Sequence, residues 1–110
     1  MLMNQDEIIS IMIEARANGS ATLSLIGQEL EVLPPEIGQL TSLIELDLGL
    51  NELTELPPEI GNLTNLTNLK VDRNHLKTLP PEIGRLRKLT HLNAGANLSL
   101  IHISEPTRPY

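Results

Sequence analysis

Leucine and isoleucine recur along this chain at a fixed long period, and polar residues fill the positions between them. The hexapeptide LPPEIG occurs at 33–38, 56–61 and 79–84, so the spacing is 23 residues each time. Self-similarity at such a period indicates a repeat architecture, in which each unit buries its apolar side chains only against its neighbours. The period therefore predicts a stacked array.

Each repeat also carries an internal pattern, LxxLxLxxNxLxxL. Copies begin at Leu43, Leu66 and Leu89, and a weaker copy begins at Ser20 with Gln in place of Asn. Alternate leucines point to one side of a short strand, so successive copies predict a parallel sheet. Asn51 and Asn74 follow their strands, where a side-chain amide can bond backbone groups of the turn.

The Pro-Pro pair of each hexapeptide supplies no backbone N–H, which predicts an extended or turning segment on the outer side of the array. Apolar residues after it, such as Ile60 and Leu63, are expected to point back into the core.

An amphipathic helix is predicted over residues 4–18. Asn4 and Glu7 have the spacing of a capping box, and Asn18-Gly19 is a helix stop. Its apolar stripe consists of Ile8, Ile9, Met12 and Ile13. We expect this helix to cover the core of the first repeat. A membrane-surface helix is the alternative, and its mostly acidic polar residues disfavour it.

The LPPEIG repeats resemble the leucine-rich repeat (LRR) family, over about residues 20–97. Their style is similar to the N-terminal repeats of bacterial cytosolic LRR proteins and of Roco-type proteins. The resemblance implies an α/β fold: a right-handed solenoid with a short parallel sheet on its concave face, an irregular or short-helical convex side and an N-terminal capping helix. The organisation would be a cap over 1–19 and about three and a half truncated repeats over 20–97.

The resemblance also implies a function, that of a protein–protein interaction scaffold in an intracellular protein. We expect this chain to be an N-terminal fragment of a longer one. One alternative is the sensor region of a Roco-type GTPase or another multidomain enzyme whose catalytic domain is absent here. A weaker alternative is a secreted effector in which the repeats precede a ligase domain.

The repeat pattern stops at Asn97. Residues 98–108 read LSLIHISEPTR, which resembles the in-frame translation of a common transposase sequencing adapter. We therefore interpret residues 98–110 as a non-native tail, against the alternative of a short natural one. The last turn would then lack a cap and leave Leu89, Leu92 and Ala94 poorly covered, which predicts marginal stability or self-association through this edge.

Partner contacts in LRR proteins usually come from the variable strand positions, which form columns across the concave face. The candidate partner-binding residues of this chain are Glu45, Asp47, Lys70, Asp72, Arg73, His91 and Asn93. Asp47 and Lys70 can pair laterally between strands. No aromatic anchor of the kind that dominates interfaces lies among these residues, and plain solvent-facing fillers are the alternative interpretation.

Composition and motifs narrow the classes of partner, location and activity that this chain can have. The net charge of −6 disfavours nucleic acid as a partner, because phosphate binding needs a basic surface. No cysteine is present, and no apolar run approaches a membrane span, so a cytoplasmic protein is expected. No metal-ligand spacing, nucleophile motif or phosphate-binding loop occurs, so we expect no metal, no cofactor and no enzyme activity in this chain.

Overall fold

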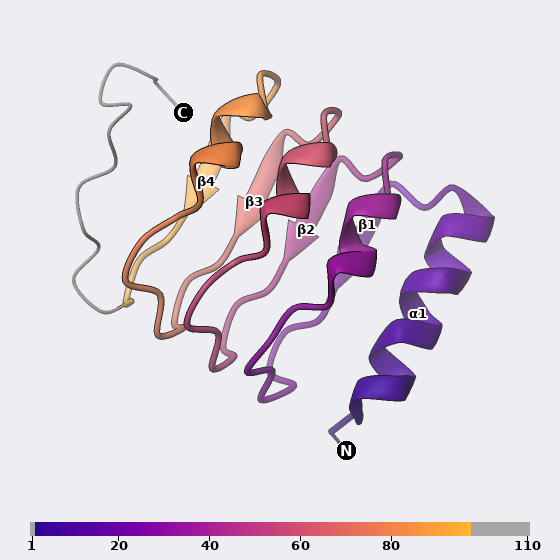
Figure 1. Cartoon of the computed structure of the whole chain (residues 1–110), viewed down its shortest axis with the longest axis horizontal. Coiled ribbons are helices and arrows are strands. Elements are labelled where there is room, and N and C mark those ends of the chain that lie inside the picture. Colours follow the sequence, from indigo (N-terminus) through magenta and orange to yellow (C-terminus); the bar gives the residue numbers. More distant parts are fainter. Residues whose placement is uncertain (1, 98–110) are drawn as a thin grey trace.

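The computed structural model describes residues 2–97, which form one N-terminal helix followed by a stack of coils (Figure 1). We number the coils by their residues: coil 1 is 20–42, coil 2 is 43–65, coil 3 is 66–88 and coil 4 is 89–97. The tail 98–110, interpreted above as adapter-derived, lies outside the described residues.

Each coil contributes one short strand to a parallel sheet. The strands are β1 (Thr22–Ser24), β2 (Glu45–Asp47), β3 (Asn68–Lys70) and β4 (His91–Asn93), and they lie side by side in chain order. Leu46 is paired with Leu23 on one side and with Leu69 on the other. This register is the repeat period itself, so equal positions of successive repeats stand next to one another, as predicted.

Short 3-10 helices form the opposite side of the stack: η1 (Pro35–Gln39), η2 (Pro58–Asn62) and η3 (Pro81–Arg85). Each begins at the second proline of its pair. A backbone N–H at the first helical position has no acceptor within the helix, so proline loses no hydrogen bond there. Each closes with a bond such as that from the Leu40 N–H to the Ile37 carbonyl, 3.1 Å long. The Pro-Pro pair therefore sets where the chain turns.

One continuous core of leucine and isoleucine runs through the stack between the strands and the 3-10 helices. In coil 2, Leu46, Leu48 and Leu53 are at most 1% exposed, and Ile60 and Leu63 are fully buried. The predicted inward direction of the residues after Pro-Pro is confirmed.

An asparagine joins each of coils 2, 3 and 4 to the preceding coil, and in coils 2 and 3 it is buried. The Asn51 amide donates to the carbonyl oxygens of Leu25 and Leu48, both at 2.9 Å. Its Oδ1 accepts from the backbone N–H groups of Gln28 at 2.9 Å and Leu30 at 3.0 Å. A buried polar group is tolerated when its donors and acceptors are satisfied, and here backbone groups of the previous coil and of its own coil satisfy them.

The same arrangement recurs in coils 3 and 4, and we call the three residues Asn51, Asn74 and Asn97 the asparagine ladder. Asn74 accepts from the Leu53 N–H and donates to the Leu48 carbonyl, both at 3.0 Å. Asn97 accepts from the Leu76 N–H at 3.0 Å. The predicted role of these amides in the turn is confirmed, and it extends to the neighbouring coil.

Helix α1 (Gln5–Asn18) covers the open end of coil 1 (Figure 1). The Asn4 Oδ1 accepts from the Glu7 N–H at 2.8 Å, and the Glu7 carboxylate accepts from the Asn4 N–H at 2.9 Å. Gly19 ends the helix with a left-handed φ of 61°. The predicted capping box and helix stop are both confirmed.

The apolar stripe of α1 was predicted only in part. Ile8 and Met12 are buried as expected, and Ala15 continues their face. Ile13 is 61% exposed, so its assignment to the buried stripe is wrong. Ile8, Met12 and Ala15 follow i, i+4, i+7 spacing, and once this face meets coil 1, Ile13 is rotated away from it.

In coil 1, the weaker first copy of the repeat, Gln28 holds the position that the ladder asparagines hold in the later coils. The Gln28 amide donates to the Ile26 carbonyl at 3.4 Å, as the Asn51 amide does to the Gly49 carbonyl, and the Gln28 Oε1 accepts a hydrogen bond from the Met3 N–H at 3.0 Å. At the other end of the stack, Leu89 is only 5% exposed, whereas Leu92 and Ala94 are half-buried. The expectation of poor coverage was thus wrong for Leu89.

The ladder predicts a large effect for one side chain. Replacing Asn51 with alanine leaves several buried backbone groups without partners, so we expect a loss of about 3 kcal/mol in unfolding free energy. Urea denaturation followed by circular dichroism measures it. Asn62→Ala, at an exposed site, should change stability by less than about 0.5 kcal/mol. Equal effects from both variants would contradict this account.

Close stacking predicts a second effect, at Gly61. A Cβ there would lie 2.8 Å from the Glu82 carbonyl oxygen in coil 3, so Gly61→Ala must push the coils apart. We expect a cost of about 1–3 kcal/mol by the same denaturation measurement. Gly95→Ala is the matched control, because among residues 2–97 its Cβ would meet only the Asn93 side chain, at an ordinary 3.4 Å. A stable Gly61→Ala protein would refute the stacking argument.

Candidate partner-binding surface

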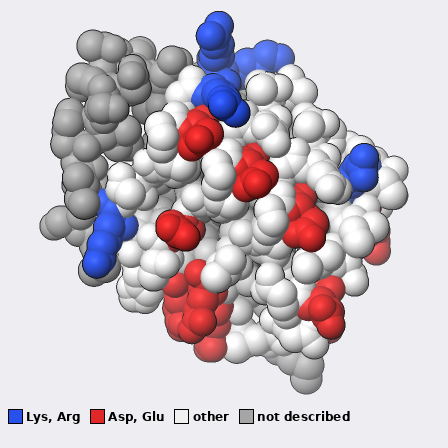
Figure 2. All heavy atoms as spheres, viewed as in Figure 1, with Lys and Arg blue, Asp and Glu red and all other residues white. Residues whose placement is uncertain are grey.

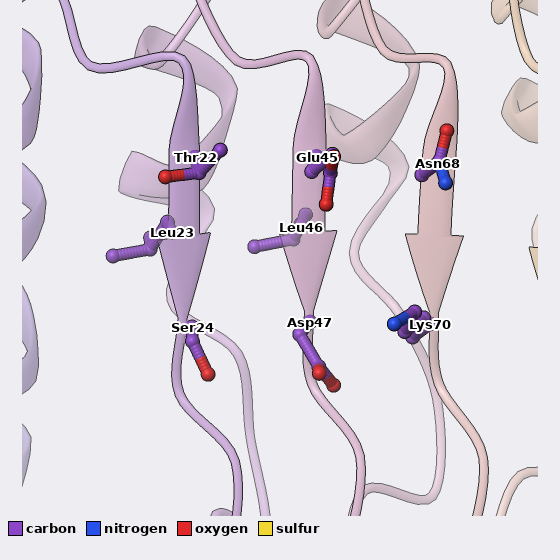
Figure 3. Close-up of a pocket in the computed structure, with 8 residues that line it drawn as sticks. All are labelled: Thr22, Leu23, Ser24, Glu45, Leu46, Asp47, Asn68 and Lys70. Carbon is purple, nitrogen blue, oxygen red and sulfur yellow. The ribbon is translucent and has the colours of Figure 1, made fainter.

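The concave face of the sheet presents polar side chains in rows that cross the strands. Figure 3 shows Thr22, Glu45 and Asn68 in one row, and Ser24, Asp47 and Lys70 in the next. The parallel register adds His91 and Asn93 to the ends of these rows. Because side chains alternate along a strand, the leucines between them turn away from this face into the core.

Two hollows lie along these rows. One of about 170 Å³ is lined by residues of β1, β2 and β3, including Glu45, Asp47 and Lys70. The other, of about 390 Å³, is lined by residues of β3 and β4 with Thr90, including His91 and Asn93. Five of the seven predicted candidate residues therefore lie on one face and border its hollows.

Asp47 is oriented by the backbone of its own coil. Its Oδ1 accepts a hydrogen bond from the Gly49 N–H at 3.0 Å, and Asn93 accepts from the Gly95 N–H in the same way at 3.1 Å. Gly49 itself is buried and has no Cβ. A Cβ there would lie 3.0 Å from the Asp72 Oδ1 and 3.2 Å from the Asp47 Oδ1. Two carboxylates from adjacent coils thus converge on this bare backbone position.

The predicted lateral pair between Asp47 and Lys70 is not formed. Within residues 2–97, no hydrogen bond joins these two side chains. The Asp47 carboxylate turns to the Gly49 N–H instead, since this donor is fixed two residues away. The exposed Lys70 ammonium therefore has no hydrogen bond to a carboxylate of the described chain.

Asp72 and Arg73, the other two candidates, lie beyond the end of β3 in the turn that leads to Asn74. Asp72 is half-buried beside Gly49, and Arg73 is exposed with a left-handed φ of 58°. They border the sheet face at its rim rather than forming part of a row.

Two exposed apolar residues at the same rim were missed as candidates. Ile26 is 45% exposed and Leu50 is 47% exposed, and both follow the strand in their coils. Neither is an aromatic anchor, and an aliphatic side chain in a variable position gives no signal in composition. Their exposure became visible only once the buried residues were known.

The outer face carries a different charge pattern. Glu36, Glu59 and Glu82 hold the same position of η1, η2 and η3. Figure 2 shows acidic side chains spread over the face turned to the viewer, with lysine and arginine confined to its margins. Arg85 at the end of η3 lies beside Glu59 and Glu82, so this face also carries charges of both signs.

Among residues 2–97, no group of three or more histidine, aspartate or glutamate side chains could hold a metal ion. No helix in this range has the length and hydropathy needed to cross a membrane.

The missing lateral pair predicts weak coupling between Asp47 and Lys70. A double-mutant cycle with Asp47→Ala and Lys70→Ala should give a coupling energy below about 0.5 kcal/mol. Chemical denaturation of the four proteins measures it. Asp47→Ala alone should still lose about 1 kcal/mol through its Gly49 hydrogen bond. A coupling energy above about 1 kcal/mol would show that the pair forms.

Comparison with known proteins gives the same architecture. The family described as Leucine Rich Repeat matches residues 42–63. The LRR domain of the type III effector XCV3220 (XopL) superposes with a TM-score of 0.79 and 28% identity, over 91% of this chain and 34% of that one. The LRR domain of APL1B gives a TM-score of 0.72 and 27% identity, over 97% of this chain and 32% of that one.

A third solved structure, of a TDR receptor, is 34% identical with a TM-score of 0.67, over 80% of this chain and 16% of that one. The chain thus spans about a third or less of the length of these structures. No curated protein sequence matches it. Taken with the parallel sheet, the 3-10 helices and the capping helix, these likenesses show that the chain folds as a leucine-rich repeat solenoid.

Proposed function

We propose that this chain is a protein-binding module whose partner contacts the concave face. The observation that carries the proposal is the pair of polar rows over the sheet, which border two hollows and contribute nothing to the core. The proposed contact residues are Glu45, Asp47, Lys70, Asp72, Arg73, His91 and Asn93.

The chemistry of these rows suits a polypeptide. Carboxylates, an ammonium, amides and hydroxyls alternate over a few ångströms, and a protein surface can present the complementary donors, acceptors and charges. The Thr90 hydroxyl and the His91 Nδ1 lie 2.9 Å apart, which adds a further polar pair at β4. Exposed groups of both signs favour selection among partners more than high affinity.

The module is proposed to act within a longer intracellular protein of the cytosolic LRR type. The LPPEIG repeats and the cysteine-free composition support this setting. The likeness to the XCV3220 domain supports a shared fold at 28% identity, and the effector role in that structure's description belongs to that protein. Residues 98–110 form no part of the proposal, because their sequence resembles adapter DNA.

Site-directed photo-crosslinking tests which face binds. A photoreactive amino acid is placed at Glu45 on the concave face or at Asn62 at the end of η2, two exposed positions on opposite sides of coil 2. Irradiation of expressing cells should give discrete protein adducts from position 45, since a partner seated on the sheet lies within reach.

Position 62 is the matched control and should give no adduct of the same mass. Adducts from position 62 alone, or the same adducts from both positions, would move the binding surface away from the concave face. Circular dichroism of both labelled proteins verifies that each keeps the fold.

A further inference from the structure

The residue before each ladder asparagine adopts a left-handed backbone. The φ angles are 56° at Leu50, 58° at Arg73 and 55° at Ala96, and Gly27 holds the equivalent place in coil 1 at 69°. This region favours glycine, because the Cβ of any other L residue crowds a neighbouring carbonyl oxygen. A chain selected only for this turn would place glycine in every coil.

Leu50 and Arg73 occupy this unfavourable position without packing into the core. Leu50 is 47% exposed, and Arg73 is exposed as well. Within the described part of the chain, no hydrogen bond holds the Arg73 guanidinium. Burial therefore does not explain why large side chains stand where glycine fits better. Backbone strain that is not offset by local contacts is a feature of functional positions.

Ile26 joins these two residues along one rim of the sheet. The Gly27 N–H bonds the Gly49 carbonyl at 3.1 Å, and the Leu50 N–H bonds the Asp72 carbonyl at 3.1 Å, so the three turns are stacked. Ile26 stands one residue before Gly27, and adjacent strands lie about 4.8 Å apart, so the turns of coils 1 and 3 are about 10 Å apart. The turns of coils 1 and 2 thus carry exposed apolar side chains, and the turn of coil 3 carries an exposed cationic one.

We propose that this rim binds an extended peptide segment of the partner, with an apolar side chain on Ile26 and Leu50 and a carboxylate on Arg73. The inference rests on the proposed function and names the partner chemistry at one edge of that face. An extended chain advances about 3.3 Å per residue, so the apolar and acidic residues stand two or three positions apart.

Charge determines which way the segment lies. The carboxylates of Asp47 and Asp72 converge beside Gly49, and they repel a partner carboxylate placed over the middle of coil 2. The Arg73 guanidinium offers a planar pair of donors to a carboxylate at coil 3. The apolar residue of the segment therefore lies over coils 1 and 2, and the acidic one lies over coil 3.

The experiment is a selection from a phage library of random octapeptides on the immobilised full chain. The wild-type protein should enrich sequences with an apolar residue two or three positions from an acidic one. Fluorescence anisotropy with an enriched peptide should then show at least a tenfold weaker affinity for Leu50→Gly. The Tm of this variant should be no lower than that of the wild type, since glycine fits the left-handed turn.

Ala96→Gly is the matched control, because it introduces glycine at the same repeat position as Leu50 but lies outside the proposed peptide site of Ile26, Leu50 and Arg73. It should leave peptide affinity unchanged. Arg73→Gly should remove the acidic preference from a repeated selection while keeping the apolar one. Leu50→Asn serves as a second variant, because asparagine also tolerates a left-handed backbone.

The inference is overturned if Leu50→Gly and Leu50→Asn bind the peptide as the wild type does, or if the wild type enriches no apolar–acidic sequence. Neither result decides the proposed function, because the adducts from position 45 report contact with the concave face without requiring Leu50. Loss of those adducts would instead remove the proposed function.

Discussion

The structure depends on one constraint, the need of a buried asparagine amide for partners in the preceding coil. Asn51 and Asn74 lie inside an aliphatic core that offers nothing to a polar side chain except backbone groups. Leaving such groups unpaired costs more than a paired hydrogen bond gains, so a displaced coil loses stability sharply. Stacking register therefore follows from polar satisfaction, while the leucines supply most of the apolar burial.

The rest of the coil is arranged around this bond. The strand must end where the amide reaches back, the residue before the asparagine must turn into the left-handed region, and glycine must stand wherever the next coil approaches closely. Gly61 shows the last requirement, since the Glu82 carbonyl leaves no room for a Cβ. The concave face is what remains: the strand positions that neither the ladder nor the core uses.

Periodic features of the fold were predictable because repetition determines neighbours. A spacing of 23 residues pairs Leu46 with Leu23 before any coordinate is known, and Asn4 with Glu7 marks the start of the helix by itself. Features that depend on one local contact were not. Ile13 and Met12 both suit an apolar stripe, and only the packing of α1 on coil 1 decides between them. The Asp47 carboxylate had two possible hydrogen-bond donors, and it accepts from the Gly49 N–H rather than from the Lys70 ammonium.

The residues of the candidate surface also divide into those that the repeat period predicts and those that only the structure shows. The rows of Glu45, Asp47, Lys70, His91 and Asn93 follow from register, so the sequence was sufficient to place them together. Leu50 required the backbone angle, because the hydrophobic pattern treats its position as neutral. A repeat protein separates its residues into those that every coil needs and those that one coil carries alone. Where a residue of the second kind occupies a position unfavourable to folding, as Leu50 does, its contribution to stability does not account for it, and the contact with a partner proposed above would account for both its exposure and its strain.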